Sequence, residues 1–200
     1  MPRTSQRGGP ETRARIRETA NRLFMERGYD AVTVAEVARE AGVSSATVFN
    51  HFPRKEDLFL DRTEDAVQLL RSAVRDGGDP LATLRSRILR LVEERHPLSG
   101  VDERSVPFYR TVANSPALVA RAREIAAELQ SILAEELRAA DFPGDADLLA
   151  SLLIAGYSTV MVGTAGRMLG GEQWDAVLVD HRARAELLFD ALERGFAHPE

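Results

Sequence analysis

Residues 34–58 read VAEVAREAGVSSATVFNHFPRKEDL, and this stretch decides the fold of the 200-residue chain. Thr33 stands just before it and Glu36 follows three residues later, which is the spacing of a capping box at the start of a helix. Apolar residues then recur on one helical face, at Val34, Val37, Ala38 and Ala41. The spacing predicts a short helix that begins directly after Thr33.

A glycine and a serine divide this stretch into two helices. Gly42 stands where the first helix ends, a position that favours a left-handed backbone, and Ser44 or Ser45 can cap the next helix. Val48 and Phe52 are expected to point into a small core. The positions left on or near the outer side are Ser45, Ala46, Thr47, Phe49, Asn50 and His51. This pattern is typical of a helix-turn-helix, whose second helix lies in the DNA major groove.

Residues on both sides of the turn match a known family pattern. They are Phe24, Gly28, Tyr29, Thr33, Val34, Ala38, Ala41, Gly42, Val43, Ser44, Thr47, Val48, Phe49, His51, Phe52, Lys55, Glu56, Asp57 and Leu58. Through them, residues 11 to about 60 resemble the DNA-binding domain of the TetR family of bacterial transcriptional regulators. The resemblance implies an all-α protein with an N-terminal three-helix bundle and a C-terminal helical domain for ligand binding and dimerisation.

The resemblance also implies which residues meet double-stranded DNA. The predicted DNA-binding residues are Thr33, Ser44, Ser45, Ala46, Thr47, Phe49, Asn50, His51 and Lys55. By this resemblance, Lys55 caps the start of the fourth helix and contacts a phosphate. Phe49 departs from the family pattern, in which the position is often Tyr. A phenol can donate to a phosphate, whereas Phe offers only an apolar contact, for example to a thymine methyl.

Charge is distributed unevenly along the chain. The formal net charge is -5, yet residues 1–55 hold ten Lys and Arg against six Asp and Glu. A basic head on an acidic body suits a protein that presents one end to phosphate. Residues 1–10 are expected to be a disordered arm. Arg3 and Arg7 are candidates for a minor-groove contact there, although a solvated tail is the simpler interpretation.

The rest of the chain is predicted to be helical throughout, with no convincing strand alternation. One long helix is expected from Arg54 to Arg75, which connects the two domains. Later helices are expected at about 80–95, 103–114, 116–140, 145–169 and 173–196, which makes nine helices in all. The expected domains are residues 11–57 for DNA binding and 58–200 for ligand binding and dimerisation.

The expected helix at 145–169 is long and apolar enough to be weighed as a membrane span. Its polar residues and three glycines favour burial in protein instead. With the last helix it could form a four-helix interface with a second copy, as the resemblance implies, although an intramolecular core explains the pattern nearly as well. The predicted dimerisation residues are Ala155, Thr159, Val162, Gly166, Leu178, Ala185, Leu188 and Leu192. We expect a homodimer with no membrane partner.

A small-molecule pocket inside the second domain is likewise implied by the resemblance. The candidate residues are Phe59, Leu69, Ile88, Phe108, Tyr109, Thr111, Val112, Tyr157 and Met161. Their aromatic and flexible side chains suit an apolar or aromatic effector, although plain core packing explains each of them singly. Arg110 and Asn114 could bind a carboxylate or carbonyl, or face solvent. Ligand binding is expected to tilt the fourth helix and release DNA, and the same device can serve corepression.

No catalytic, metal or cofactor site is expected. The four histidines lack metal-ligand spacing, and the sequence has no GxSxG elbow, no phosphate-binding glycine loop and no cysteine. A helical adaptor that contacts protein is the alternative, but its binding face should show larger apolar anchors, and only Phe49 qualifies. An N-terminus without the apolar core of a signal peptide, together with a DNA partner, favours the cytoplasm.

Overall fold

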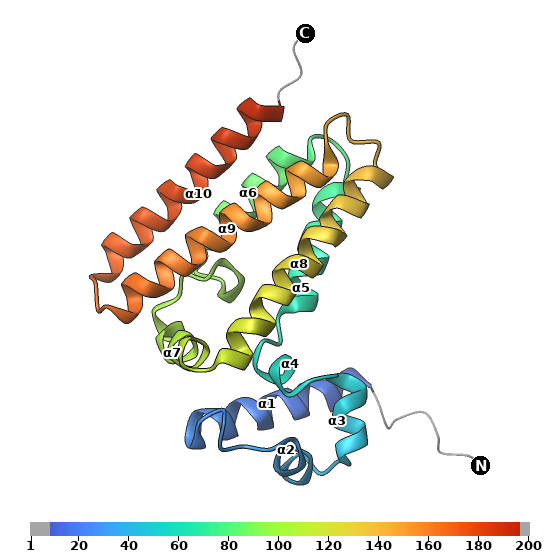
Figure 1. Cartoon of the computed structure of the whole chain (residues 1–200), viewed down its shortest axis with the longest axis vertical. Coiled ribbons are helices and arrows are strands. Elements are labelled where there is room, and N and C mark those ends of the chain that lie inside the picture. Colours follow the sequence, from blue (N-terminus) through green and yellow to red (C-terminus); the bar gives the residue numbers. More distant parts are fainter. Residues whose placement is uncertain (1–8, 197–200) are drawn as a thin grey trace, which may run out of the picture. The chain divides into compact units, whose positions relative to one another are not determined.

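The computed structural model describes residues 9–196, apart from the side chain of Glu103 (Figure 1). Within this range it has helices and no strands, which confirms the all-α class. The α-helices are α1 Pro10–Arg27, α2 Val34–Glu40, α3 Ser45–His51, α4 Lys55–Phe59, α5 Thr63–Arg75, α6 Pro80–Glu93, α7 Val106–Asn114, α8 Pro116–Ala139, α9 Ala146–Leu169 and α10 Trp174–Phe196, with 3₁₀ helices η1 Pro97–Ser99 and η2 Glu103–Ser105. Arg3 and Arg7 lie outside the described residues.

The chain divides by its contacts into two compact units. The first holds the described residues up to Asp61 together with Thr111–Arg121, and the second holds Arg62–Arg110 and residues 122–196. The boundary expected after residue 57 therefore falls four residues later in this division. The first unit also includes a segment of α7 and α8 that is distant in the sequence.

The helix expected from Arg54 to Arg75 is interrupted, so ten α-helices are described in place of nine. α4 ends at Phe59, and Leu60 leaves helical geometry with a ψ of 54° before α5 begins at Thr63. No glycine or proline stands at the break, so the sequence carries no local signal for it. The interruption lets Leu58 and Phe59 pack into the first unit, while α5 belongs to the second.

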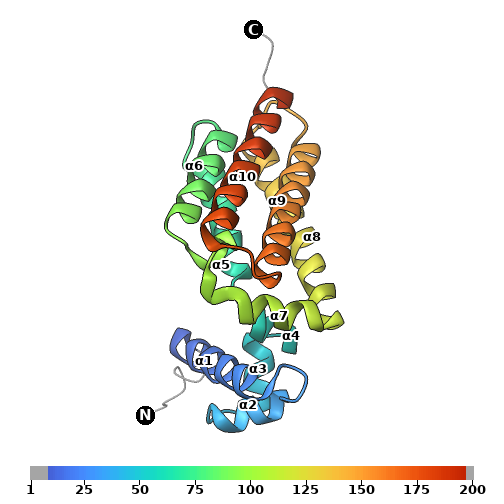
Figure 2. The same cartoon turned by 90° about the vertical axis from the view of Figure 1, so that its left-hand side faces the viewer.

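Aromatic side chains form the centre of the first unit. The Phe24 ring lies 5.1 Å from that of Tyr29, and the Phe59 ring lies 5.8 Å from each of them. Val48 of α3 and Phe52 are buried in the same unit. α1 packs against α2 and α4, and α2 packs against α3, so the short helices are stabilised by tertiary contacts and not by their own propensity alone (Figure 2).

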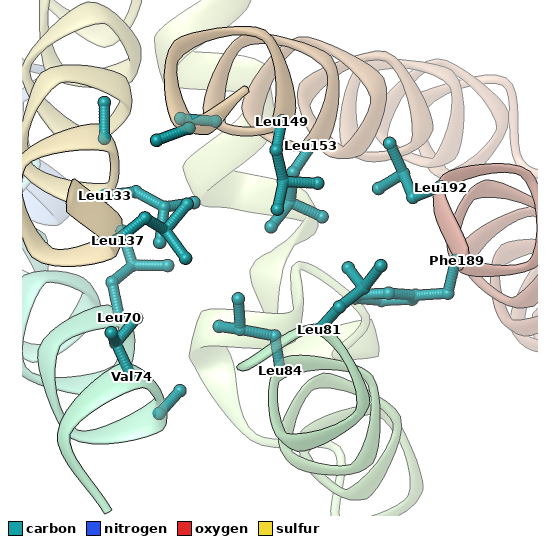
Figure 3. Packing of buried hydrophobic residues seen from close by; sticks show 14 of the residues in the cluster. Leu70, Val74, Leu81, Leu84, Leu133, Leu137, Leu149, Leu153, Phe189 and Leu192 are labelled. Carbon is teal, nitrogen blue, oxygen red and sulfur yellow. The ribbon is translucent and has the colours of Figure 1, made fainter. Parts of the chain in front are cut away.

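The core of the second unit is built by five long helices. Leucine, valine and phenylalanine side chains from α5, α6, α8, α9 and α10 converge there (Figure 3). Labelled members are Leu70, Val74, Leu81, Leu84, Leu133, Leu137, Leu149, Leu153, Phe189 and Leu192. α9 and α10 run side by side in both views of the ribbon (Figures 1 and 2). This packing leaves one face of the pair uncovered.

Candidate nucleic-acid interface

The first short helix of the interface, α2, begins with the capping box that the sequence predicts. The Glu36 backbone N–H donates to Thr33 Oγ1 at 3.2 Å, and the Thr33 backbone N–H donates to Glu36 Oε2 at 2.8 Å. The hydrogen bonds that the Thr33 backbone N–H and hydroxyl donate to the Glu36 carboxyl hold its pKa below the ordinary value. The Thr33 hydroxyl also donates to Glu36. This predicted DNA-binding residue therefore caps the N-terminus of α2.

The turn between α2 and α3 is closed by backbone hydrogen bonds. Gly42 adopts a φ of +67°, its N–H donates to the Arg39 carbonyl at 3.2 Å, and the Val43 N–H donates to Ala38 at 2.9 Å. The two bonds form a Schellman motif, which satisfies the last carbonyls of α2. The left-handed backbone explains why glycine stands at this position.

Ser44 caps α3 and sets which side of the helix faces outward. Its Oγ accepts from the Thr47 backbone N–H at 3.0 Å and lies 2.8 Å from Thr47 Oγ1. Val48 and Phe52 are buried, as expected. The predicted residues Ala46, Phe49 and Asn50 are therefore exposed, while Ser45, Thr47 and His51 are half-buried.

Two arginines of α1 hold the ends of both short helices. Arg15 Nε donates to the Ala41 carbonyl at 3.0 Å, and Arg13 Nη1 donates to the His51 carbonyl at 2.5 Å. The Arg13 guanidinium also lies 4.3 Å from the centre of the Phe52 ring. A cation at a helix C-terminus satisfies orphan carbonyls and opposes the helix dipole. Sequence reasoning missed this role, because both arginines counted there only as basic charge.

Lys55 is tied to the protein itself. Its Nζ donates to the Tyr29 carbonyl at 2.7 Å and lies 4.1 Å from the centre of the Tyr29 ring. Partial burial lowers the pKa of this amine. Burial, with the nearby Glu56 carboxylate, raises the pKa of the Tyr29 phenol. Lys55, the first residue of α4, thus joins this helix to the loop after α1.

A second link within the first unit joins α4 to the start of α8. Arg121 Nε donates to Asp57 Oδ1 at 2.7 Å, and only 11% and 16% of the two side chains are exposed. Asp57 Oδ2 accepts from the Arg54 backbone N–H at 3.2 Å, so the same carboxylate also caps α4. The partners are 64 residues apart, a separation at which no sequence pattern could have paired them.

The predicted pocket residues fall into three groups. Phe59, Thr111 and Val112 belong to the first unit, and the other candidates belong to the second. Leu69 is half-buried against the core of the second unit, and Ile88 is buried in it. Of the remaining four, Tyr109, Tyr157 and Met161 lie close to the loop around Gly100, and the Phe108 ring lies 5.5 Å from that of Tyr109.

This loop is contacted by the two tyrosines and the methionine. Tyr109 Oη donates to the Gly100 carbonyl at 2.7 Å, and Tyr157 Oη donates to the Ser99 carbonyl at 3.1 Å. A Cβ added at Gly100 would lie 2.7 Å from Met161 Cε and 2.9 Å from Tyr109 Oη, so the space is filled. Burial raises the pKa of Tyr109 to about 12.

His181 of α10 is one of the buried polar residues of the second unit. It is fully buried, with its ring 6.0 Å from Tyr157 and Nδ1 2.8 Å from Thr164 Oγ1. Its Nε2 has no hydrogen-bond partner among the described residues. Burial, together with the Arg184 charge, lowers the pKa of His181 to about 4. The imidazole is therefore neutral at pH 7.

The predicted dimerisation residues divide between surface and core. On α9, Ala155, Thr159, Val162 and Gly166 lie on the outer side, where they are exposed. On α10, Ala185 and Leu192 are buried within the chain's own core, while Leu178 and Leu188 are half-buried. α10 carries two apolar stripes, and its exposed stripe instead contains Val179 and Leu187. Apolar periodicity could not tell the inward stripe from the outward one.

A helix-turn-helix with a capped, outward-facing second helix defines a DNA-binding domain. The family model described as "Bacterial regulatory proteins, tetR family" matches residues 16–61. The HTH-type transcriptional regulator AcrR of Shigella flexneri is 32% identical over 98 residues, 46% of each chain. The HTH-type transcriptional regulator TtgR of Pseudomonas putida is 34% identical over 99 residues, 47% of each chain. The match thus spans about half the length of these curated relatives.

The likeness to solved structures covers most of the chain. FadR of Thermus thermophilus, a TetR family transcriptional repressor solved in complex with lauroyl-CoA, has a TM-score of 0.58 and 26% identity, over 94% of this chain and 96% of that chain. The first unit is therefore a helix-turn-helix domain of the kind found in bacterial transcriptional regulators. More narrowly, its residues 16–61 match the TetR family model, and the fold of most of the chain resembles that of a TetR family repressor.

Proposed function

We propose that the protein is a ligand-responsive transcriptional repressor that binds a palindromic operator as a homodimer and is released by a small molecule. The observation that carries this proposal is the outer face of α3. Ser44 caps the N-terminus of this helix, Arg13 binds the carbonyl of His51 at its end, and Ala46, Phe49 and Asn50 stay exposed. Selection of bound DNA from a random pool with the full-length protein tests it. A two-fold symmetric site is expected, and recovery of no common sequence would contradict the proposal.

The uncovered face of α9 and α10 is the proposed dimer interface. Val162 and Leu187 are 73% and 63% exposed, and a groove between the helices is lined by small and apolar residues, among them Ala155, Gly156 and Leu188. A second copy would cover this face in an isologous four-helix packing. Two-fold symmetry also supplies the second recognition helix, without which a helix as short as α3 reads few bases.

A membrane is the other occupant to weigh for this face. α9 is long and apolar enough to span one by length and composition, and 28% of its most apolar window is buried in the described part of the chain. The helix nevertheless packs along α10 and buries Thr164 against His181. These contacts favour a soluble dimer over a helix that spans a membrane. Light scattering at micromolar concentration should give twice the mass of the chain.

The effector site is proposed at Tyr109, Tyr157 and Met161 in the second unit. Aromatic rings and a flexible thioether suit an apolar or aromatic molecule. FadR, a protein of similar fold, was solved in complex with lauroyl-CoA, a ligand that includes an apolar acyl chain. Because Met161 fills the space beside Gly100, the ligand would have to displace it, and the displacement would move the adjoining helices.

Release from DNA is proposed to pass through α8. Its first residues belong to the first unit, where Arg121 holds Asp57 at the start of α4, and its later residues belong to the second unit. A movement of α8 would therefore move the first unit, which carries the recognition helix α3. Operator affinity would fall when the two recognition helices of the dimer no longer match successive major grooves. The same linkage can work in the opposite direction, as corepression.

An adaptor or an enzyme explains the observations less well. The relatives that match are transcriptional regulators, and no group of three His, Cys, Asp or Glu that could hold a metal occurs within residues 9–196. A protein-binding α3 would lose no DNA affinity on Thr47→Ala. A DNA-binding α3 should change its preference at particular bases.

A further inference from the structure

The outer face of α3 consists of three residues at helical spacing. Ala46, Phe49 and Asn50 stand at positions i, i+3 and i+4, and all three are exposed. Phe49 is 48% exposed, and among the large apolar side chains described in the first unit only Met25, on α1, is also exposed. An exposed phenyl ring beside an amide is a specific chemical surface, in contrast to a solvated polar face.

Several of the hydrogen-bonding groups next to this surface have partners within the protein. The Ser44 and Thr47 hydroxyls pair with each other at 2.8 Å, and the His51 carbonyl accepts from Arg13. α3 itself contains no arginine or lysine, the residues that most often read guanine through O6 and N7. Asn50 is the exposed residue of the helix that can donate and accept at one base edge.

From this surface we infer that α3 selects A·T base pairs in each operator half-site, with Phe49 against a thymine methyl and Asn50 on the N6 and N7 groups of an adenine. The C5 methyl of thymine is the apolar group that the four unmodified base pairs offer in the major groove, and an Asn amide matches adenine in a bidentate manner. The inference rests on the proposed function and specifies which base pairs α3 recognises. Ala46 leaves room for the bases to approach.

Phe49 therefore acts as a specificity residue and not as a phosphate contact. Phenylalanine has no donor for a phosphate oxygen, so its gain must come from apolar area removed from water. One methyl group buried in this way changes an equilibrium constant about fourfold. The amide contact of Asn50 is expected to be worth more, about tenfold for the correct base.

Base analogues test the inference with the unmodified protein. The selected operator is prepared with uracil in place of thymine, which removes only the methyl, or with 7-deazaadenine in place of adenine, which removes only the N7 acceptor. Each replacement is made singly at the positions under α3. We expect about a fourfold loss of affinity for one uracil and about a tenfold loss for one 7-deazaadenine, by fluorescence anisotropy at fixed salt.

Variants assign each loss to its residue. Phe49→Ala should bind the thymine and uracil operators equally while keeping the penalty for 7-deazaadenine, and Asn50→Ala should show the reverse. Met25→Ala, which trims the exposed side chain on α1, should keep both penalties. Both α3 substitutions are at exposed positions, and an unchanged melting temperature verifies that the variants fold.

Two results would overturn the inference while leaving the proposed function intact. One is a selected palindrome with G·C pairs at every position under α3, and the other is a uracil penalty that Phe49→Ala retains in full. If the random pool yields no common sequence, the proposed function fails, and this inference fails with it.

Discussion

The first unit and the second unit differ in what holds their helices and in what they leave open. In the first, hydrogen bonds from Thr33, Ser44, Arg13 and Arg15 hold the ends of the short helices. The open face of α3 is small and presents the Phe49 ring beside the Asn50 amide. In the second, long helices are held by apolar packing, and the open face of α9 and α10 is large and apolar. The difference teaches that a helix that recognises bases must be held at both of its ends. An interface with a second copy depends mainly on the apolar area that it buries.

The largest expected effect comes from a charge placed on the apolar face of the second unit. Leu187→Asp should convert the proposed dimer into a monomer, because a carboxylate buried in an apolar interface lacks a partner. Operator affinity should fall by about two orders of magnitude or more, since one half-site remains. Light scattering and a titration of the selected operator measure the two effects.

Met25→Asp is the matched control for that substitution. Met25 is an exposed large apolar residue of the first unit, with 57% of its surface open to solvent. The same change there should leave the mass of the assembly unaltered. If Leu187→Asp also stays dimeric, the proposed interface lies elsewhere.

The next largest effect concerns acid and the buried histidine of the second unit. Above about pH 6.5 His181 is neutral in both folded and unfolded chains. Between that value and about pH 4 the unfolded chain binds a proton that the folded chain does not, so stability is lost as the pH falls. The full loss from this residue is about 3 kcal/mol, on the order expected for the lowered pKa.

His181→Gln isolates this contribution. The variant keeps a polar side chain beside Thr164 but removes the titration, so its urea-unfolding free energy should change less than that of the wild type between pH 6.5 and 5. Equal slopes for the two proteins would show that His181 is not the group responsible. The first unit depends on no such buried histidine, because His51 is half-buried.

Local rules predicted the first unit well. The capping box, Gly42 and the inward positions of Val48 and Phe52 all depend on residues within a few positions of one another, and the structure has each of them. The outward face of α3 followed from the same short-range pattern. These features could be read from the sequence because the physics that determines them is local.

Long-range features of the molecule could not be read in this way. The break at Leu60 has no glycine or proline to announce it, and the two apolar stripes of α10 look alike until the neighbouring helices are in place. The pairing of Arg121 with Asp57 depends on how α8 returns to α4. Tertiary packing decides each of these.

The link between α8 and α4 is expected to have a smaller effect than the histidine. Arg121→Ala leaves the Asp57 carboxylate largely buried without its guanidinium partner. A double-mutant cycle with Asp57→Asn should give a coupling free energy of about 2 kcal/mol, measured by urea unfolding. Asn retains the shape and the cap acceptor of Asp57. Additive effects of the two substitutions would mean that the pair does not join the helices.

The smallest expected effect separates two roles of Lys55. Its amine is held by the Tyr29 carbonyl, so Lys55→Ala should lower the free energy of unfolding by about 1 kcal/mol, a charge-assisted hydrogen bond discounted for partial exposure. If a remaining N–H of Lys55 also contacts a phosphate, as the family resemblance implies, the substitution should also change the salt dependence of binding. The slope of log affinity against log salt concentration should become less steep by about one. Arg39→Ala, which removes an exposed cation from α2, is the comparison for unfolding and should leave stability nearly unchanged. A stability loss without a change in the salt slope would make Lys55 a positioning residue only. The one lysine of the chain would then serve, like Arg13 and Arg15, to hold a helix end in place and not to contact DNA.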